Sequence, residues 1–204
     1  KYKMIIIDPL VRKNIFKLNS LNSKKDIFTI LIVGGSQGAN IFDKNLKDVI
    51  VNVSKKNSIK VIQQTNEKNI SSLSDFYSKN NIENKVFSFD QKFSENLEKT
   101  DLCITRAGAS TLAELSVSNI PFIAVPLPTS KDNHQLENAN FYKNNDCCWI
   151  IEQNNFDREI EDFLMDTLVD KRDFLKKKEN LKKLNFQNSW INVNQKILKV
   201  INEN

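Results

Sequence analysis

The chain has 204 residues, of which 40% are hydrophobic and 27% are charged. A chain of this length and composition can bury a core as one domain, which excludes collagen-like, disulfide-knotted and disordered proteins. The net charge of +5 is a small excess that favours anionic ligands in general and does not indicate nucleic acid.

The first 27 residues lack the periodicity of the rest of the chain. Residues 4–7 are typical of a short strand, residues 8–9 of a turn, and residues 19–26 of a polar linker. The chain also begins with Lys1 and not with methionine. We therefore expect residues 1–27 to be an interdomain linker and the start of a domain, inside a longer protein.

From residue 28 onward, short apolar runs rich in β-branched residues alternate with longer segments of helical period. The runs predict strands at residues 28–33, 59–65, 86–89, 102–105, 121–125 and 148–151. Between the first two, hydrophobic residues recur at steps of three and four, which predicts a helix with one buried face. We therefore expect an α/β fold, a Rossmann-like doubly wound parallel sheet of about six strands.

After residue 153 the sequence shows only helical patterns. They cover residues 156–169, 171–184 and 189–200. We expect extra carboxyl-terminal helices, with residues 28–188 forming the main domain and residues 189–204 forming a separate terminal helix.

A glycine-rich turn, Gly-Gly-Ser-Gln-Gly at residues 34–38, joins the first strand to the first helix. Such a turn lets backbone amides approach a phosphate closely. Its spacing is neither GxGxxG nor GxxxxGK[ST], which argues against NAD binding and ATP hydrolysis. A tight turn without a ligand explains this stretch equally well.

A second candidate stretch is residues 105–114, Thr-Arg-Ala-Gly-Ala-Ser-Thr-Leu-Ala-Glu. We expect a strand to end here and Ser110 or Thr111 to begin a helix, whose N-terminus favours a diphosphate. Glu114 lies one turn further, where its carboxylate can accept hydrogen bonds from ribose hydroxyls. The alternative, slightly favoured from this stretch alone, is that Ser110 or Thr111 forms only a capping arrangement with Glu114.

The third candidate is the proline-punctuated loop at residues 126–135. It contains His134, the only histidine, beside Gln135, and this pair suits recognition of sugar hydroxyls. A lone histidine is more often a surface residue than a catalyst. The sequence has no Ser-His-Asp order, no HExxH and no Asp-x-Asp pair, so neither a catalytic metal nor a metal-bridged diphosphate is expected.

Together, and in this order, the three stretches resemble the carboxyl-terminal domain of the bacterial family 28 glycosyltransferases of peptidoglycan synthesis. The resemblance implies the carboxyl-terminal half of a GT-B fold, which would make residues 28–188 the domain that binds the donor UDP-GlcNAc. It implies inverting transfer of N-acetylglucosamine to lipid I to form lipid II, with no metal or other cofactor for donor binding. The donor-binding residues that it implies are Arg12, Gly35, Ser36, Gln37, Phe89, Asp90, Ala109, Ser110, Thr111, Glu114, His134 and Gln135.

Within this set, the resemblance implies that Glu114 binds the ribose. Ser110 and Thr111, with the amides that follow them, would hold the diphosphate. Ser36 and Gln37 would contact the donor from the facing loop.

The same resemblance places the base and the sugar of the donor. Phe89 and the backbone of Asp90 would read the uracil, and His134 and Gln135 would contact the N-acetylglucosamine hydroxyls. The family's Asn-Pro-x-Arg segment appears here with Asp in place of Asn and with one extra residue before Arg12.

The family's amino-terminal half is expected to supply the catalytic base, the lipid I site and the membrane contact. We therefore expect a hexosyltransferase when the protein is intact, a fragment that is inactive alone, and a terminal helix at residues 189–204 that packs toward that half. The longest apolar runs are far shorter than the roughly 18 to 20 residues of a membrane span. The three cysteines have no CxxC spacing, which is typical of a reducing compartment. We expect a cytoplasmic protein at the inner face of the bacterial membrane.

Three alternatives stay open at this stage. The chain is compatible with the catalytic subunit of another split UDP-GlcNAc transferase, such as the eukaryotic pair that builds dolichol-linked chitobiose. It is also compatible with a UDP-GlcNAc 2-epimerase-like protein, which shares the GT-B fold and the donor. A nucleotide-sugar binding module without catalysis is the third.

Overall fold

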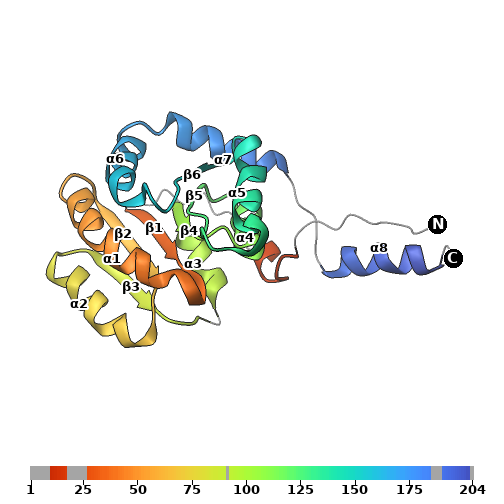
Figure 1. The fold of residues 1–204 in the computed structure, drawn as a ribbon, viewed down its shortest axis with the longest axis horizontal. Helices are drawn as coiled ribbons and strands as arrows, with labels where there is room; N and C mark the ends of the chain where they lie inside the picture. The colour runs from red at the N-terminus through yellow and green to blue at the C-terminus, as the bar shows by residue number, and fades with distance from the viewer. Residues whose placement is uncertain (1–9, 18–26, 91, 185–189, 203–204) are drawn as a thin grey trace.

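The computed structural model describes the chain except for residues 1–9, 18–26, 91, 185–189 and 203–204 (Figure 1). For residues 17, 36–39 and 190–192 it describes the backbone alone. The predicted strand at residues 4–7 and the predicted polar linker therefore lie outside the described residues.

Six parallel strands form one sheet in the order β3-β2-β1-β4-β5-β6. They are β1 (Phe28–Val33), β2 (Ile59–Gln64), β3 (Glu83–Phe87), β4 (Leu102–Thr105), β5 (Phe122–Ala124) and β6 (Cys148–Ile150). The strand order reverses between β1 and β4, which is the switch point of a doubly wound sheet. The predicted fold class is thus confirmed.

The third strand differs from its prediction at both ends. It begins at Glu83 and ends at Phe87, whereas the sequence predicted residues 86–89. Its first residues are polar because β3 is an edge strand with one face toward solvent, and they join the sheet by pairing with β2, Lys60 opposite Glu83. Phe89 therefore lies beyond the strand.

Helices cover both faces of the sheet (Figure 1). They are α1 (Gly35–Ser54), α2 (Ile70–Lys79), α3 (Phe93–Lys99), α4 (Ala109–Val117), α5 (His134–Asn144), α6 (Phe156–Val169), α7 (Arg172–Leu184) and α8 (Trp190–Asn202). Short 3-10 turns precede or join them: η1 (Ile15–Lys17), η2 (Glu67–Asn69) and η3 (Lys131–Asn133). None of the described helices is long and apolar enough to cross a membrane.

Two hydrophobic clusters lie on opposite faces of the sheet, because successive residues of β1 point to alternate sides. Ile30 and Ile32 belong to the cluster that α1, α2 and α6 cover. Leu31 and Val33 belong to the cluster that α4 and α5 cover. The central strand is therefore buried on both faces, as its uninterrupted apolar sequence predicts.

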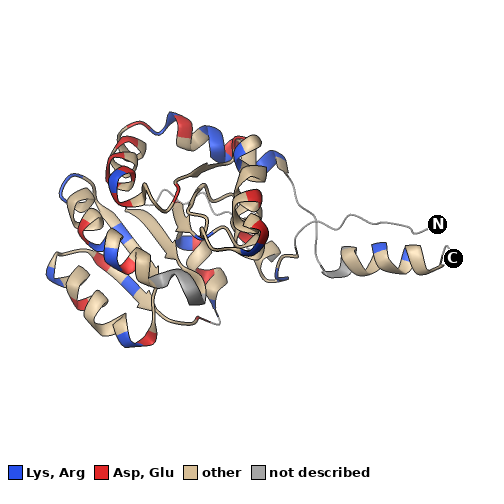
Figure 2. Cartoon of the chain, in the orientation of Figure 1, with Lys and Arg blue, Asp and Glu red and all other residues tan. Residues whose placement is uncertain are grey.

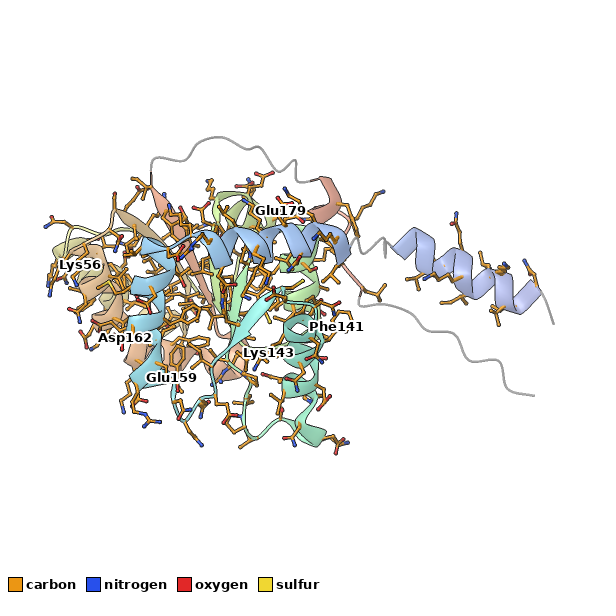
Figure 3. The ribbon with its side chains drawn as sticks, turned by 90° about the horizontal axis from the view of Figure 1, so that it is seen from above. Lys56, Phe141, Lys143, Glu159, Asp162 and Glu179 are labelled. Carbon is orange, nitrogen blue, oxygen red and sulfur yellow. The ribbon has the colours of Figure 1, made fainter. Side chains whose placement is uncertain are left out.

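The described part of the first 27 residues packs on the second cluster. Val11 and Ile15 are each only 1% exposed, and η1 lies against α4. At the other end of the chain, α8 extends away from the sheet and its helices (Figures 1 and 3). How the chain divides at residues 27 and 188 stays a prediction.

Helix α7 is fixed to the edge of the sheet by a cluster of charges around Asp146. The Lys177 side chain is 6% exposed, and its ammonium group lies 2.8 Å from Asp146 Oδ1 and 4.8 Å from the centre of the Trp149 ring. Lys176 binds the other carboxylate oxygen at 2.8 Å. Figure 2 shows that basic and acidic residues alternate along the helices.

Replacing Asp146 by Asn should lower the free energy of unfolding by about 1 to 2 kcal/mol near neutral pH, because buried Lys177 loses its nearest charged acceptor. Asn tolerates the positive φ of 53° at this position. Lys176 and Lys177 hold the pKa of Asp146 below its ordinary value of 3.8. The stabilisation is therefore present above that value and is lost as the pH falls through the lower folded pKa.

Urea unfolding of the two proteins at about pH 7 and about pH 3 measures both effects, and the difference between them should shrink at the lower pH. Glu179→Gln is the control, since Glu179 pairs only with exposed Lys182 among the described ion pairs. An equal loss in both variants would contradict the role of Asp146.

Candidate functional site

The glycine-rich turn leaves the carboxyl end of β1 and leads directly into α1. Gly35 is the first residue of the helix and has a φ of +62°, a conformation that glycine adopts without the strain a side chain brings. Its N–H donates to Gln64 Oε1 on β2 at 3.2 Å. Ser36 and Gln37 lie in the first turn of α1, and their side chains are outside the described residues.

Asp43, two helical turns after Gly35, holds α1 against the end of β2. Its Oδ1 accepts from Gln63 Nε2 at 2.9 Å, and its Oδ2 accepts from Thr65 Oγ1 and from Asn69 Nδ2 at 3.0 Å. Tyr77 Oη donates to Gln63 Oε1 at 2.6 Å. Gln63 and Thr65 are buried, so this carboxylate satisfies donors that have left water.

The second stretch forms the N-terminus of α4. The helix begins at Ala109, one residue before the earlier of the two predicted starts, and Gly108 occupies the N-cap position. No side chain caps the helix, so the predicted capping arrangement of Ser110 or Thr111 with Glu114 is wrong. Ala109 and Ser110 are exposed and Thr111 is half-buried, which leaves the first-turn N–H groups accessible.

Glu114 faces the second cluster and forms an ion pair with Arg12. Arg12 Nε donates to Oε1 at 2.5 Å and Nη2 donates to Oε2 at 2.7 Å. The Glu114 side chain is 6% exposed, and that of Arg12 is 50% exposed. The bond to the carboxylate raises the pKa of Arg12.

Arg106 is buried at the end of β4, and no role was predicted for it from the sequence. Its Nη1 donates to Val125 O at 3.0 Å, and Nη2 donates to Gln153 Oε1 at 2.6 Å. The guanidinium lies over the Phe42 ring at 5.4 Å, and burial lowers the pKa of Arg106. Arg106 thus ties the end of β4 to the end of β5. Its place directly after an apolar strand is the signal that could have indicated a buried cation.

The third stretch contains two consecutive left-handed residues, Asp132 and Asn133, with φ of 51° and 53°. They turn the chain into α5, whose first residue is His134. The Nδ1 atom of His134 donates to Lys131 O at 2.7 Å, since a carbonyl only accepts. Neutral His134 therefore has its proton on Nδ1 and presents an acceptor at Nε2.

Two amide side chains of α5 fix its position at this edge. Gln135 Oε1 accepts from the Leu127 N–H at 3.0 Å, which closes the loop. Asn138 Nδ2 donates to Ala107 O at 3.0 Å, which joins the second and third stretches directly. His134 is exposed and Gln135 is half-buried.

Beyond β3, Phe89 is 79% exposed. The neighbouring Asp90 side chain accepts from Lys85 Nζ at 2.6 Å, from Asn96 Nδ2 at 3.0 Å and from the Lys92 N–H at 2.8 Å. Lys85 lowers the pKa of Asp90. The Asp90 side chain thus fixes the shape of the loop that follows β3.

The three stretches and the segment after β3 each follow a parallel strand. The predicted site residues in them therefore lie along one edge of the sheet. Gly35, Phe89, Ser110 and His134 come after β1, β3, β4 and β5 respectively. Arg12 comes from outside the sheet and reaches this group through Glu114. An open cavity of about 670 Å³ beside the start of α1 is lined by Asn40, Asn66, Glu67 and Lys68.

The described residues contain no group of three His, Cys, Asp or Glu side chains that could hold a metal ion. The edge combines the helix N–H groups at the start of α4, the buried carboxylate of Glu114, the exposed Phe89 and the imidazole of His134.

Residues 29–193 match the Glycosyltransferase family 28 C-terminal domain. Over its full length the chain is 44% identical to a UDP-N-acetylglucosamine--N-acetylmuramyl-(pentapeptide) pyrophosphoryl-undecaprenol N-acetylglucosamine transferase of Pelagibacter ubique, and covers 58% of that protein. A transferase of the same name from Rickettsia canadensis is 36% identical over 82% of this chain, and the match covers 49% of that transferase. The chain therefore spans about half the length of the curated relatives that it matches.

Solved structures show the same fold. MurG of Acinetobacter baumannii superposes with a TM-score of 0.77 and 23% identity, over 93% of this chain and 55% of that one. The glycosyltransferase VinC, in complex with dTDP, superposes with a TM-score of 0.64 and 14% identity, over 90% of this chain and 44% of that one.

Replacing Asp43 by Ala should lower the free energy of unfolding by about 1 to 3 kcal/mol, because buried donors of Gln63 and Thr65 lose their acceptor. Urea unfolding measures the loss. Asp48→Ala is the matched control, since Asp48 lies on the exposed side of the same helix. Similar losses in the two variants would show that the network does not hold α1 in place.

Proposed function

Because the chain belongs to the glycosyltransferase family 28 C-terminal domain family, as its sequence predicted, we propose that it is the donor-binding half of a transferase. The intact enzyme would move N-acetylglucosamine from UDP-GlcNAc to lipid I and so form lipid II. The observation that carries this proposal is the family match over residues 29–193. The name of the 44% identical relative supports the choice of donor and acceptor.

The nucleotide would bind along the edge of the sheet described above. The diphosphate would lie at the start of α4, where Ser110, Thr111 and uncapped N–H groups offer donors and the helix dipole favours negative charge. The buried carboxylate of Glu114 would accept hydrogen bonds from the ribose. Phe89 would contact the uracil with its exposed ring, and Asp90 with its backbone.

The sugar would lie toward the start of α5. His134 Nε2 is an acceptor and would take a hydrogen bond from an N-acetylglucosamine hydroxyl. Gln135, whose oxygen is already bound by Leu127 N–H, would donate through its amide nitrogen. Gly35, Ser36 and Gln37 would close the other side of the donor.

The reaction would be a displacement at the anomeric carbon of the donor sugar. An acceptor hydroxyl forms the new bond as the bond to UDP breaks, and the configuration inverts. The described chain would stabilise the leaving diphosphate with helix N–H groups and not with a metal. The base that removes the hydroxyl proton would come from the amino-terminal half.

The amino-terminal half would also carry lipid I and contact the inner face of the cytoplasmic membrane. Residues 1–27 would lead from that half into the donor domain. Helix α8, which exposes Ile197, Leu198 and Ile201, would pack toward it. A helix with exposed apolar residues gains stability by burying them against another surface.

Calorimetric titration of the chain with UDP-GlcNAc, UDP, UDP-glucose and ATP, with and without magnesium, tests the proposal. We expect the uridine ligands to bind without magnesium, UDP-GlcNAc to bind most tightly, and ATP to stay unbound. Binding of ATP with equal affinity, or a strict need for magnesium, would contradict the proposed donor site.

Replacing His134 by Ala should weaken UDP-GlcNAc about two- to tenfold and leave UDP unchanged, because one neutral hydrogen bond to the sugar is lost. His134→Gln keeps an acceptor and should lose less. Glu137→Ala, an exposed change on the same helix, is the control. The same calorimetry measures the affinity of each variant and of the unaltered chain for UDP and for UDP-GlcNAc. Equal losses for the two ligands would show that His134 does not contact the sugar.

A further inference from the structure

The Arg12–Glu114 pair joins two segments that are 102 positions apart in the sequence. Both oxygens of the carboxylate are bound by one guanidinium, in the parallel two-bond geometry that fixes a carboxylate most strongly. Glu114 is nearly inaccessible while Arg12 is half exposed. The carboxylate is therefore buried against a guanidinium that binds both of its oxygens.

Arg12 is itself held in place from several sides. Its neighbour Val11 and nearby Ile15 are buried in the second cluster, and the Ile15 N–H donates to Arg12 O at 3.0 Å. The guanidinium lies over the Phe93 ring at 5.4 Å. A flexible side chain anchored in this way loses little further entropy on pairing, so the bond is preorganised.

The pair does not use every acceptor site of the carboxylate. An ionised carboxylate has about four lone-pair sites, and the two bonds from Arg12 use two of them. The remaining sites can accept from two hydroxyl groups on neighbouring carbons. Arg12 is thus compatible with a bound diol and need not leave when the diol arrives.

We propose that Arg12 is a positioning residue for ribose recognition, which orients the Glu114 carboxylate toward the ribose hydroxyls and does not itself touch the donor. The proposal rests on the proposed function, because it takes Glu114 as the ribose ligand. It differs from the role that the family resemblance implies for Arg12, which is direct contact with the donor.

The consequence is a change in selectivity and not only in affinity. When Glu114 is well oriented, UDP binds more tightly than 2′-deoxy-UDP, because the deoxy ligand lacks one hydroxyl that the carboxylate would bind. When the orientation is lost, UDP affinity falls to that of the deoxy ligand. The affinity for 2′-deoxy-UDP falls by less, because that ligand keeps only one of the two hydroxyl groups that the carboxylate would bind.

Calorimetry of the chain with UDP and 2′-deoxy-UDP measures this ratio. We expect the unaltered chain to favour UDP by about tenfold or more, as for a hydrogen bond to a charged group. Glu114→Ala should bring the ratio to about one. Arg12→Gln should do the same, and Arg12→Lys, which keeps the charge but not the two-bond geometry, should give an intermediate ratio.

Lys13→Gln is the matched control, because Lys13 is exposed beside Arg12 and its loss removes the same unit of charge. Its ratio should equal that of the unaltered chain. Thermal unfolding of each variant shows that the fold is retained. Arg12→Lys keeps the test valid if Arg12→Gln does not fold.

The outcomes separate the positioning role from the function on which it rests. One outcome is that Glu114→Ala loses the preference for UDP over 2′-deoxy-UDP while both Arg12 variants keep it. This outcome would overturn the proposal and leave the ribose assignment of Glu114 intact. Tighter UDP binding in Arg12→Gln would show that Arg12 blocks the site, which also overturns it. A chain that binds no UDP, or that binds both nucleotides equally, would refute the donor or ribose assignment itself.

Discussion

The parallel pairing of β1 with β2 on one side and β4 on the other is the constraint on which the rest of the structure depends. Because all strands run the same way, every loop that follows a strand emerges at one edge of the sheet. The order reverses at β1 and β4, so the loops after these two strands lead into helices on opposite faces of the sheet. The glycine-rich turn and the start of α4 therefore follow two neighbouring strands at the same edge.

Buried polar groups then fix the loops to one another, since backbone pairing ends where the strands end. Arg106 binds carbonyl groups after β5, and Asn138 binds a carbonyl group before α4. Asp43 performs the same task between α1 and β2. Each of these groups satisfies donors or acceptors that have left water, so moving one loop would leave polar atoms unpaired in its neighbours.

The sequence predicted the fold well because the strands are apolar and the helices have a clear period. It placed β1 and β4 correctly, but placed β3 too late, because the polar residues Glu83 and Lys85 join the strand by pairing with β2, which no hydrophobic pattern predicts. The capping prediction failed since Gly108 precedes the helix. The contact between Arg12 and Glu114 depends on tertiary packing over 102 positions, which no local pattern contains. The ligand assignments themselves stay predictions.

The position of α7 determines how the domain unfolds. Phe174 at its start belongs to one hydrophobic cluster, and Leu181 near its end belongs to the other. The helix therefore links two layers that the sheet otherwise separates, and neither layer can open while α7 stays docked. Amide hydrogens of β1 and α7 should thus exchange with solvent only in the same global unfolding event, whereas those of α8, which lies apart, exchange through local fluctuations.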